Sequence, residues 1–409
     1  MNNIHILNIL LFLISFFSIN TSSAKHNFSK WVAMWGNAMS IVDNMPEAYS
    51  KNITLRYPIF CPFNGDSLRL RFDNFAGTET ITINKITISQ CKEEENAIEN
   101  SFVIVNIPKD GLKIPPKQNI LTEPIFFNVE EGKKILVSFY LKDFTLMRSS
   151  VAILGPLSLG FYGIGDMTEI ANPDINLTKK TSWFYFLSDI DVHTNDENKA
   201  IICYGDSITS QDWPDYLMLE LKKNNVNNLS VIRKAASGTR ILREYSCITY
   251  ESYGLCGKNR IPRELNVSGA KYLIIQQGIN DIIHPVGLKE NKFRPMEDLP
   301  TLPELIKGME YYIKEAEKKG LEIFLGTLLP IYGWRTYEDF REELKNGFND
   351  WMRNKVDKKH VIDFHKVLED ENDFRKFKNG YDSGDHLHPS VEAYKKMAEE
   401  AFKSISENL

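Results

Sequence analysis

The stretch from Ala200 to Thr209, which reads AIICYGDSIT, constrains the fold of this chain more than any other. Its apolar half is long enough for one buried strand and ends abruptly at Gly205-Asp206-Ser207. A helical pattern follows from Trp213 to Lys223, so we expect a strand–turn–helix unit with a serine hydroxyl at the turn. In open α/β sheets ligands bind beyond the carboxyl ends of the strands, where helix N-termini favour negative charge. This placement suits a nucleophile that generates an oxyanion; the alternative is a serine that only caps the helix.

Strands alternate with helical patterns from residue 199 to 409. The expected strands are Ile201–Tyr204, Ser230–Ile232, Tyr272–Ile275, Ile323–Thr327 and Val361–Ile362, and the expected helices are Trp213–Lys223, Leu302–Lys319, Glu338–Lys355 and Val391–Ser404. Parallel strands need long crossovers, which are usually helical. This order therefore predicts an α/β domain, a parallel sheet with helices on both faces in three layers.

Residues 29–192 follow a different pattern, in which apolar and polar residues alternate with period two. The alternation is clear in Ser67–Phe72, Ile135–Tyr140 and Trp183–Phe186, and it changes phase at Asn84-Lys85, where we expect a bulge or turn. Short strands with turn residues between them predict an antiparallel, jelly-roll-like β-sandwich. The polar segment 193–198 is then the linker between the two domains.

The N-terminus has the pattern of a secretory signal peptide, which we place at residues 1–24. Ile4 to Ile19 is almost wholly apolar, and Ser22-Ser23-Ala24 supplies small residues for cleavage. The segment before the apolar run lacks Lys and Arg, and an uncleaved anchor is the alternative. We expect a secreted protein without stable membrane insertion after cleavage, and the net charge of -5 argues against a nucleic-acid partner.

The chain has five cysteines, a number that fits an oxidising compartment without requiring one. Cys247 and Cys256 flank a short loop and are the best candidates for a disulfide bridge. Cys61 and Cys91 are candidates for a second bridge, whereas Cys203 lies in the buried strand and is expected to be a free thiol. Because no Cys/His group has zinc spacing, we expect no metal and no cofactor.

Four groups of polar or glycine residues follow successive strands or precede the last helix. They are Ser207, then Gly238, then Gly278-Ile279-Asn280-Asp281, and finally Asp385-His386-Leu387-His388-Pro389. Acyl transfer needs this set of groups: a serine, a histidine that takes its proton, a carboxylate that orients the histidine, and donors that receive the oxyanion. Each group also has a structural interpretation as a turn glycine or a helix cap, but four of them at one edge of a sheet favour the chemical one.

These four blocks resemble those of the GDSL esterases, also called SGNH hydrolases, and the resemblance covers residues 199–405. The first half resembles the β-rich domain that precedes the catalytic domain in secreted members. The resemblance implies that Ser207 is the nucleophile, His388 the general base and Asp385 the group that orients it. It also implies an oxyanion hole made of the N–H of Ser207, the N–H of Gly238 and the side chain of Asn280.

Two histidines compete for the role of base, because His386 and His388 both lie close to Asp385. Pro389 biases His388 away from helical backbone angles and leaves it on a turn. A turn from Asp385 to His388 can fold the carboxylate back onto the imidazole, whereas adjacent residues usually point apart. We therefore expect His388 to face Ser207.

The function expected from the sequence is that of a secreted serine esterase acting on small acyl esters, with acetylated saccharides as the expected substrate partner. Tyr332, Trp334 and Tyr337 follow the fourth strand and are candidates to stack on a sugar face. The alternatives are a lipid esterase of the lipase type and a glycan-binding protein whose hydrolase half is weakly active. A phosphodiesterase or nuclease is a more distant alternative, because no cluster of metal-ligating residues is evident.

Overall fold

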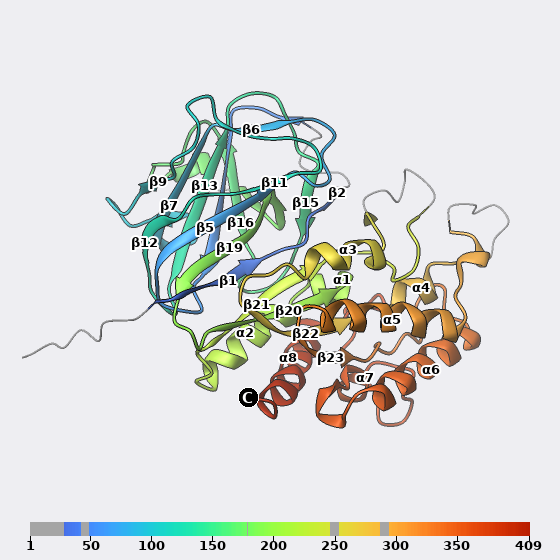
Figure 1. Ribbon diagram of the computed structural model, residues 1–409. Helices are drawn as coiled ribbons and strands as arrows, with labels where there is room; N and C mark the ends of the chain where they lie inside the picture. The colour runs from blue at the N-terminus through green and yellow to red at the C-terminus, as the bar shows by residue number, and fades with distance from the viewer. Residues whose placement is uncertain (1–27, 42–48, 178, 246–252, 287–293) are drawn as a thin grey trace, which may run out of the picture.

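The structure of this protein is a computed structural model that describes residues 28–41, 49–177, 179–245, 253–286 and 294–409. The signal peptide predicted at residues 1–24 lies outside these ranges. Within them, no helix combines the length and the apolar character that a membrane crossing needs. Figure 1 shows a β-rich body formed by the first half of the chain, packed against an α/β body formed by the second half.

Two antiparallel sheets dominate the first half. The smaller has the order β1–β19–β5–β11, with β12 also paired to β5, and the larger has the order β17–β16–β4–β13–β7–β8, with β9 paired to β7. The bounds in the smaller sheet are β1 Lys30–Gly36, β5 Gly65–Asp73, β11 Asn119–Leu121, β12 Ile125–Val129 and β19 Leu187–Thr194. Those in the larger are β4 Ile53–Phe60, β7 Lys85–Glu93, β8 Asn96–Ala97, β9 Val103–Ile104, β13 Lys134–Leu141, β16 Gly160–Ile164 and β17 Lys179–Thr181. Three small sheets complete the described part of this half: β10–β6, β14–β3 and β18–β15–β2. Their strands are β2 Ser40–Ile41, β3 Tyr49–Ser50, β6 Ile81–Ile83, β10 Leu112–Ile114, β14 Thr145–Leu146, β15 Ser149–Ala152 and β18 Trp183–Tyr185, and a 3-10 turn lies at Asp174–Leu177.

The two large sheets face each other across one hydrophobic core, as a sandwich requires. The period-two pattern directs alternate apolar side chains of each strand inward, so that Phe72 of β5 meets Phe139 of β13 with ring centroids 5.4 Å apart. The phase change at Asn84 marks the point where the chain leaves β6 and enters β7, which belongs to a different sheet. The expected antiparallel β-rich domain is confirmed.

The second half contains a parallel sheet with the order β21–β20–β22–β23–β24. Its strands are β20 Lys199–Gly205, β21 Leu229–Ala235, β22 Ala270–Gln276, β23 Glu322–Gly326 and β24 Val361–Ile362. The helices are α1 Ser207–Ser210, α2 Trp213–Lys223, α3 Gly257–Glu264, α4 Ile279–Ile283, α5 Leu302–Glu317, α6 Asp339–Lys355, α7 Phe364–Leu368 and α8 Val391–Ser406, with 3-10 turns at Met296–Asp298 and Lys358–His360. All five expected strands and all four expected helices are confirmed; the short helices α1, α3, α4 and α7 were not expected.

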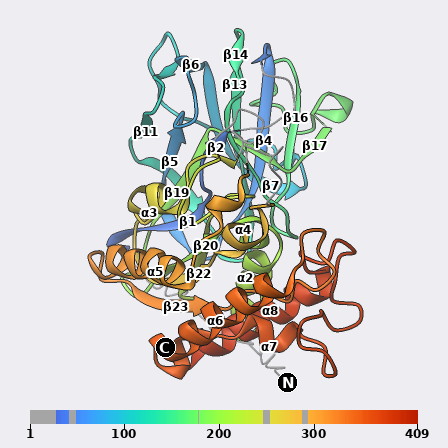
Figure 2. The same ribbon diagram turned by 90° about the vertical axis from the view of Figure 1, so that its right-hand side faces the viewer.

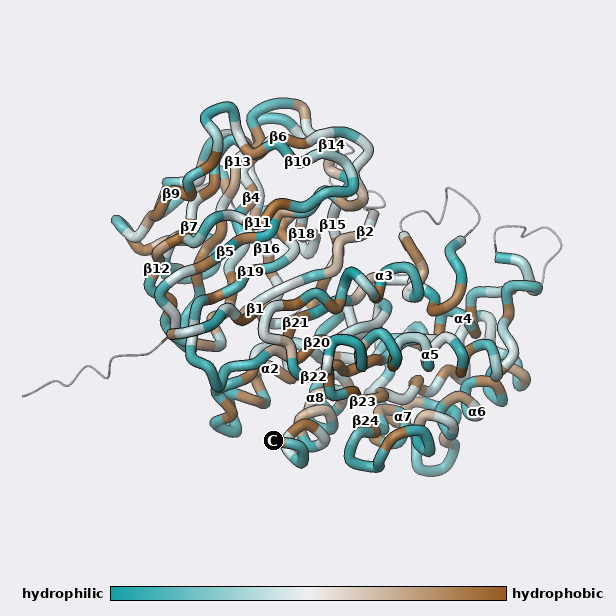
Figure 3. The backbone as a smooth tube through the Cα atoms, in the orientation of Figure 1, coloured by the Kyte–Doolittle hydropathy of each residue, from teal (hydrophilic) through white to brown (hydrophobic). Residues whose placement is uncertain are grey.

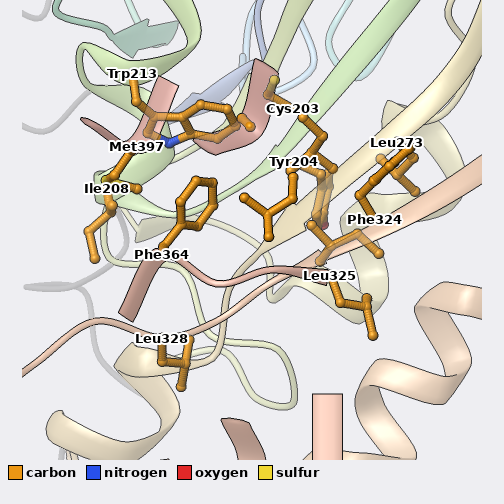
Figure 4. Packing of buried hydrophobic residues seen from close by; sticks show 14 of the residues in the cluster. Cys203, Tyr204, Ile208, Trp213, Leu273, Phe324, Leu325, Leu328, Phe364 and Met397 are labelled. Carbon is orange, nitrogen blue, oxygen red and sulfur yellow. The ribbon is translucent and has the colours of Figure 1, made fainter. Parts of the chain in front are cut away.

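Helices cover both faces of this sheet. On one face α2, α7 and α8 pack together, where Trp213 and Phe364 have ring centroids 5.5 Å apart and Met397 lies beside them (Figure 4). On the other, Tyr312 of α5 meets Tyr204 of β20 at 5.4 Å. Hydrophilic and hydrophobic colours alternate along the helices in Figure 3, as expected for helices that face a core on one side. The structure is thus the three-layer α/β arrangement that the sequence predicts.

The sandwich and the parallel sheet share an interface along β1, which lies between them in Figures 1 and 2. The Ala33 N–H donates to the carbonyl oxygen of Ser268 at 2.8 Å, and the Ser230 hydroxyl donates to the Ala33 carbonyl oxygen at 2.6 Å. Ala200 and Ile232, from the parallel sheet, are buried with the core of the sandwich. The two halves of the chain are therefore packed as one body.

Ion pairs with buried carboxylates reinforce this interface. Lys234 of β21 lies 2.6 Å from the Asp189 carboxylate of β19, and its ammonium also donates to the carbonyl oxygen of Asn37 at 2.8 Å. Arg263 of α3 pairs with Asp73 of β5 at 3.0 Å. In addition, β19 ends at Thr194 and β20 begins at Lys199, so the segment expected as a linker is a short turn.

The disulfide predictions have different outcomes. Cys61, Cys91, Cys203 and Cys256 are free thiols, so the expected pairing of Cys61 with Cys91 is wrong. These two residues follow β4 and lie on β7, and β13 runs between those strands. Two strand spacings amount to about 10 Å, which exceeds the Cα separation that a disulfide spans. Cys247, the proposed partner of Cys256, lies outside the described residues.

The buried pair of Lys234 and Asp189 gives a test of the interface. Lys234→Met should lower the free energy of unfolding by about 3 kcal/mol, because it leaves the buried Asp189 carboxylate with only the longer contact to Arg71, at 3.7 Å. Urea denaturation measures this change. Lys180→Met, which removes the exposed pair with Glu94, should cost less than about 1 kcal/mol. An equal fall in the free energy of unfolding in both variants would show that the interface pair stabilises the protein no more than an exposed pair does.

Candidate active site

The nucleophile candidate Ser207 begins α1 directly after β20. Asp206 is fully buried and caps this short helix by accepting a hydrogen bond from the N–H of Ile208 at 3.1 Å. Burial raises the pKa of Asp206 to about 7. A Cβ on Gly205 would lie 2.4 Å from the carbonyl oxygen of Gln276, so the chain needs glycine to make this turn against β22.

The structure brings the three expected catalytic side chains into one hydrogen-bonded chain. Ser207 Oγ lies 2.9 Å from His388 Nε2, and His388 Nδ1 lies 2.6 Å from Asp385 Oδ2. The other carboxylate oxygen, Oδ1, accepts the N–H groups of Leu387 at 2.9 Å and of His388 at 2.8 Å. This carboxylate therefore closes the turn and fixes the orientation of the imidazole at the same time.

The charge state of Asp385 favours this orientation. Burial acts to raise the pKa of the carboxyl, but the hydrogen bonds from the side chain and backbone of His388 outweigh it and hold the pKa below its ordinary value of 3.8. An ionised carboxylate only accepts hydrogen bonds, so His388 Nδ1 carries the proton. His388 Nε2 is then free to accept the hydroxyl proton of Ser207.

His386 occupies a different position. Its Nδ1 lies 2.5 Å from Asp382 Oδ2, and its side chain is 51% exposed. Its backbone φ of +64° lies in the left-handed region, which turns the chain between Asp385 and His388. The structure therefore places His388, and not His386, against Ser207.

The expected oxyanion donors lie at the same edge of the sheet. Gly238 has a φ of +75°, and a Cβ there would lie 2.1 Å from the ring of Tyr253. The Asn280 amide is buried and donates to the carbonyl oxygen of Thr239, the residue after Gly238, at 3.1 Å. Ser237 Oγ lies 3.1 Å from Ser210 Oγ at the end of α1. The blocks that contain Ser207, Gly238 and Asn280 are thus joined by direct contacts.

Asp281 has a larger part in this arrangement than the sequence suggested. Its two carboxylate oxygens accept the N–H groups of Ile241 at 2.7 Å and Leu242 at 3.1 Å. It thereby ties the loop after Gly238 to α4, which carries Asn280. Burial raises its pKa to about 6 in spite of these donors.

A cluster of rings behind Gly238 was not predicted. The Tyr245 hydroxyl donates to the Gly238 carbonyl oxygen at 2.8 Å and also contacts His284 Nδ1, and Tyr253 stacks on His284 with centroids 5.8 Å apart. Burial, followed by the charges of Arg294, Arg240, Arg335 and His388, lowers the pKa of His284 to about 3. His284 therefore stays neutral at physiological pH. The only signal for it was its position four residues after Asn280.

No group of three or more His, Cys, Asp or Glu side chains within the described ranges is arranged to hold a metal ion.

Comparison with known proteins shows what the second half of the chain is similar to. Residues 203–396, just under half of the chain, match the model of the GDSL-like lipase/acylhydrolase family. No curated protein sequence matches the chain.

Several solved structures are similar to this domain. A GDSL-like lipase from Bacteroides thetaiotaomicron is 15% identical, with 53% of this chain and 91% of that one covered and a TM-score of 0.38. A lipolytic protein of the G-D-S-L family from Desulfitobacterium hafniense is 19% identical, with 51% and 99% covered and a TM-score of 0.37. A carbohydrate acetylesterase from Sinorhizobium meliloti is 14% identical, with 52% and 100% covered and a TM-score of 0.37.

Asp281→Asn tests the tie between α4 and the loop after Gly238. An amide has a single oxygen, so one of two buried N–H groups loses its acceptor, and the free energy of unfolding should fall by about 1–3 kcal/mol. Denaturation together with hydrogen exchange at Ile241 and Leu242 measures the effect. The exposed Asp350→Asn is the control and should change stability by less than about 1 kcal/mol.

Asp281→Asn also tests how the free energy of unfolding depends on pH. Because burial raises the pKa of Asp281 from 3.8 to about 6, the folded chain binds this proton more tightly than the unfolded chain. This group therefore lowers the free energy of unfolding as the pH rises from 3.8 to about 6, and Asp281→Asn should remove that part of the slope. An unchanged slope would contradict the assignment.

Proposed function

We propose that this protein is a secreted serine esterase that removes small acyl groups, most of all acetyl groups, from carbohydrate. The observation that carries the esterase assignment is the hydrogen-bonded chain from Ser207 through His388 to Asp385. Secretion is supported by the apolar segment Ile4–Ile19 and the small residues that follow it.

The geometry supports a two-step reaction. His388 Nε2 takes the proton of Ser207 as Oγ attacks the ester carbonyl carbon, and the N–H groups of Ser207 and Gly238 with the Asn280 amide receive the oxyanion. The intermediate then expels the alcohol, which takes the proton from His388, and leaves an acyl group on Ser207. A water molecule that gives its proton to His388 attacks the carbonyl carbon of this acyl-enzyme. The bond from that carbon to Ser207 Oγ then breaks, Oγ takes the proton back from His388, and the carboxylic acid is released. Asp385 stabilises the imidazolium in both steps.

A cleft beside the catalytic loop supports a carbohydrate substrate. It has a volume of about 470 Å³ and is lined by Tyr332, Gly333, Tyr337, Glu338, Asp339 and Arg375. A Cβ on Gly333 would lie 2.9 Å from the ring of His386, so the cleft adjoins the turn that carries His388. Tyr332 is 38% exposed, and its ring meets that of Tyr337 at 5.0 Å.

The lining of this cleft suits a neutral, hydroxyl-rich ring better than a lipid chain. Two aromatic rings offer apolar surface, while two carboxylates and a guanidinium offer hydrogen-bond partners for hydroxyl groups. The charge of Arg375 is balanced by Asp373, which it contacts through Nε at 2.8 Å and Nη2 at 2.9 Å. Trp334, the third aromatic candidate, is only 9% exposed and belongs to the hydrophobic core.

The first test of the proposed function concerns the nucleophile and the base. Ser207→Ala and His388→Ala should lower the turnover of a small acetyl ester by at least about a thousandfold, because each removes a member of the triad. A fluorophosphonate should label Ser207 in the wild-type protein. His386→Ala is the matched control and should retain most of the catalytic rate. Substantial turnover by a folded Ser207→Ala protein would refute the esterase assignment.

The second test concerns the carbohydrate. Tyr332→Ala should lower kcat/KM for an acetylated oligosaccharide roughly tenfold, as expected from the loss of about 1.4 kcal/mol of ring contact. Tyr332→Phe should keep the wild-type value because it keeps the ring. Turnover of 4-nitrophenyl acetate, which has no sugar ring to stack on Tyr332, should not change in either variant. Phe126→Ala, at an exposed ring on the sandwich, controls for unspecific effects.

A further inference from the structure

We propose that the N-terminal sandwich positions the nucleophile: residues 154–158, which follow β15, hold the C-terminal end of α1 together with Arg233 of β21. This proposal rests on the proposed function, since it assumes that Ser207 attacks the ester. It assigns to the sandwich a part in catalysis that does not require it to bind substrate.

The helix α1 needs outside support because it has a single turn, Ser207–Ser210. The last carbonyl groups of a helix have no partner within it. Here the Ser210 carbonyl oxygen accepts two hydrogen bonds, one from the N–H of Leu154 and one from Arg233 Nη1, both at 3.1 Å. The same Nη1 donates to the Leu154 carbonyl oxygen at 2.9 Å. One guanidinium thus joins the sandwich to the helix that begins with Ser207.

Asp215, in the first turn of α2, holds the other side of this junction. Its Oδ1 lies 2.5 Å from Arg233 Nη2, and its Oδ2 accepts the N–H of Leu157 and the hydroxyl of Ser158, each at 2.9 Å. Arg233 is only 4% exposed. The planar guanidinium gives these charge-assisted bonds a fixed direction, and burial makes the loss of either partner costly because the other charge is left unpaired.

The backbone at Gly155 is shaped for this contact. Its φ of +141° is rarely adopted by residues with a side chain, and a Cβ there would lie 2.2 Å from Asp215 Oδ2. Only glycine therefore lets residues 154–158 close over the carboxylate. Gly155→Ala therefore adds one carbon atom that displaces residues 154–158 from Asp215 and leaves the proposed catalytic side chains unchanged.

The remaining contacts of α1 show what the sandwich adds. Asp206 caps the helix at its N-terminus, and Ser210 Oγ contacts Ser237 beside Gly238. These contacts come from the hydrolase domain itself. Among the sandwich residues that the structure describes, the hydrogen bond to this helix comes from Leu154 in the segment 154–158. Because reacting groups must be aligned closely, a shift of about 1 Å at α1 relative to His388 is enough to cost on the order of a hundredfold in rate.

Another contact between the two domains provides the matched control. Arg263 pairs with Asp73 at 3.0 Å and lies over the Phe75 ring, with its guanidinium carbon 3.8 Å from the centroid. It joins the same two bodies through α3 rather than through α1. If the sandwich only adds stability, weakening either junction has the same consequence for catalysis.

The experiment uses the full chain and compares Gly155→Ala and Arg233→Lys with Arg263→Lys. Active sites are titrated with a fluorophosphonate, and the acylation rate constant per titrated site is measured with 4-nitrophenyl acetate in the pre-steady state. We expect Gly155→Ala and Arg233→Lys to lower this constant ten- to a hundredfold, with the dissociation constant of the ester within threefold of wild type. Arg263→Lys should keep the wild-type acylation rate constant.

The proposal is overturned if the two variants fold and acylate within threefold of wild type, or if Arg263→Lys loses as much as they do. Should either variant fail to fold, Asp215→Asn takes its place, and a wild-type acylation rate constant in that variant overturns the proposal equally. Failure of the proposed function has a different signature, because the wild-type protein itself would then neither hydrolyse the ester nor be labelled at Ser207.

Discussion

One hydrogen bond, between Ser207 Oγ and His388 Nε2, joins positions that lie 181 residues apart in the chain. It forms because the first strand of the parallel sheet and the loop before the last helix end at the same edge. The carboxyl ends of all the parallel strands lie at one edge of the sheet. The turn after β20 and the turn before α8 both lie at this edge and therefore meet. The three-layer packing that fixes the sheet also fixes this distance.

Buried polar groups hold the edge in shape. Asp206 and Asp281 are carboxylates in an apolar interior, and burial raises the pKa of each well above its ordinary value. Backbone N–H groups of Ile208, Ile241 and Leu242 compensate part of that cost. The loops that carry the proposed catalytic groups are therefore held by directional bonds, whereas the apolar core beneath them fixes only their general position.

The sandwich is joined to the hydrolase domain by contacts of two kinds. Some, such as the pair of Lys234 with Asp189, link β21 to β19 and hold the two bodies together. Others, from Arg233 and residues 154–158, end directly on α1. A rigid shared body with short connections is consistent with a sandwich that supports the catalytic geometry rather than one that moves independently.

The sequence by itself determined the class of both halves and the elements of the catalytic one. Period-two alternation and the succession of strand and helix patterns reveal which segments are strands and which are helices, because each element must turn its apolar side chains toward a core. The candidate catalytic blocks were visible for the same reason: Ser207, Gly238, Asn280 and the turn from Asp385 to His388 each lie next to the end or the start of an element whose bounds could be placed. Pro389 was enough to favour His388 over His386, since its effect on the backbone is local.

Tertiary structure alone decided which distant groups meet. The bonds of Asp281 to Ile241, of Arg233 to Ser210 and Leu154, and of Tyr245 to Gly238 connect segments whose separation in the chain carries no signal of contact. The wrong pairing of Cys61 with Cys91 has the same origin, because strand order in an antiparallel sheet is set by packing and not by the period of each strand. Local periodicity fixes what each segment is, and the burial of all segments against one another fixes where it lies.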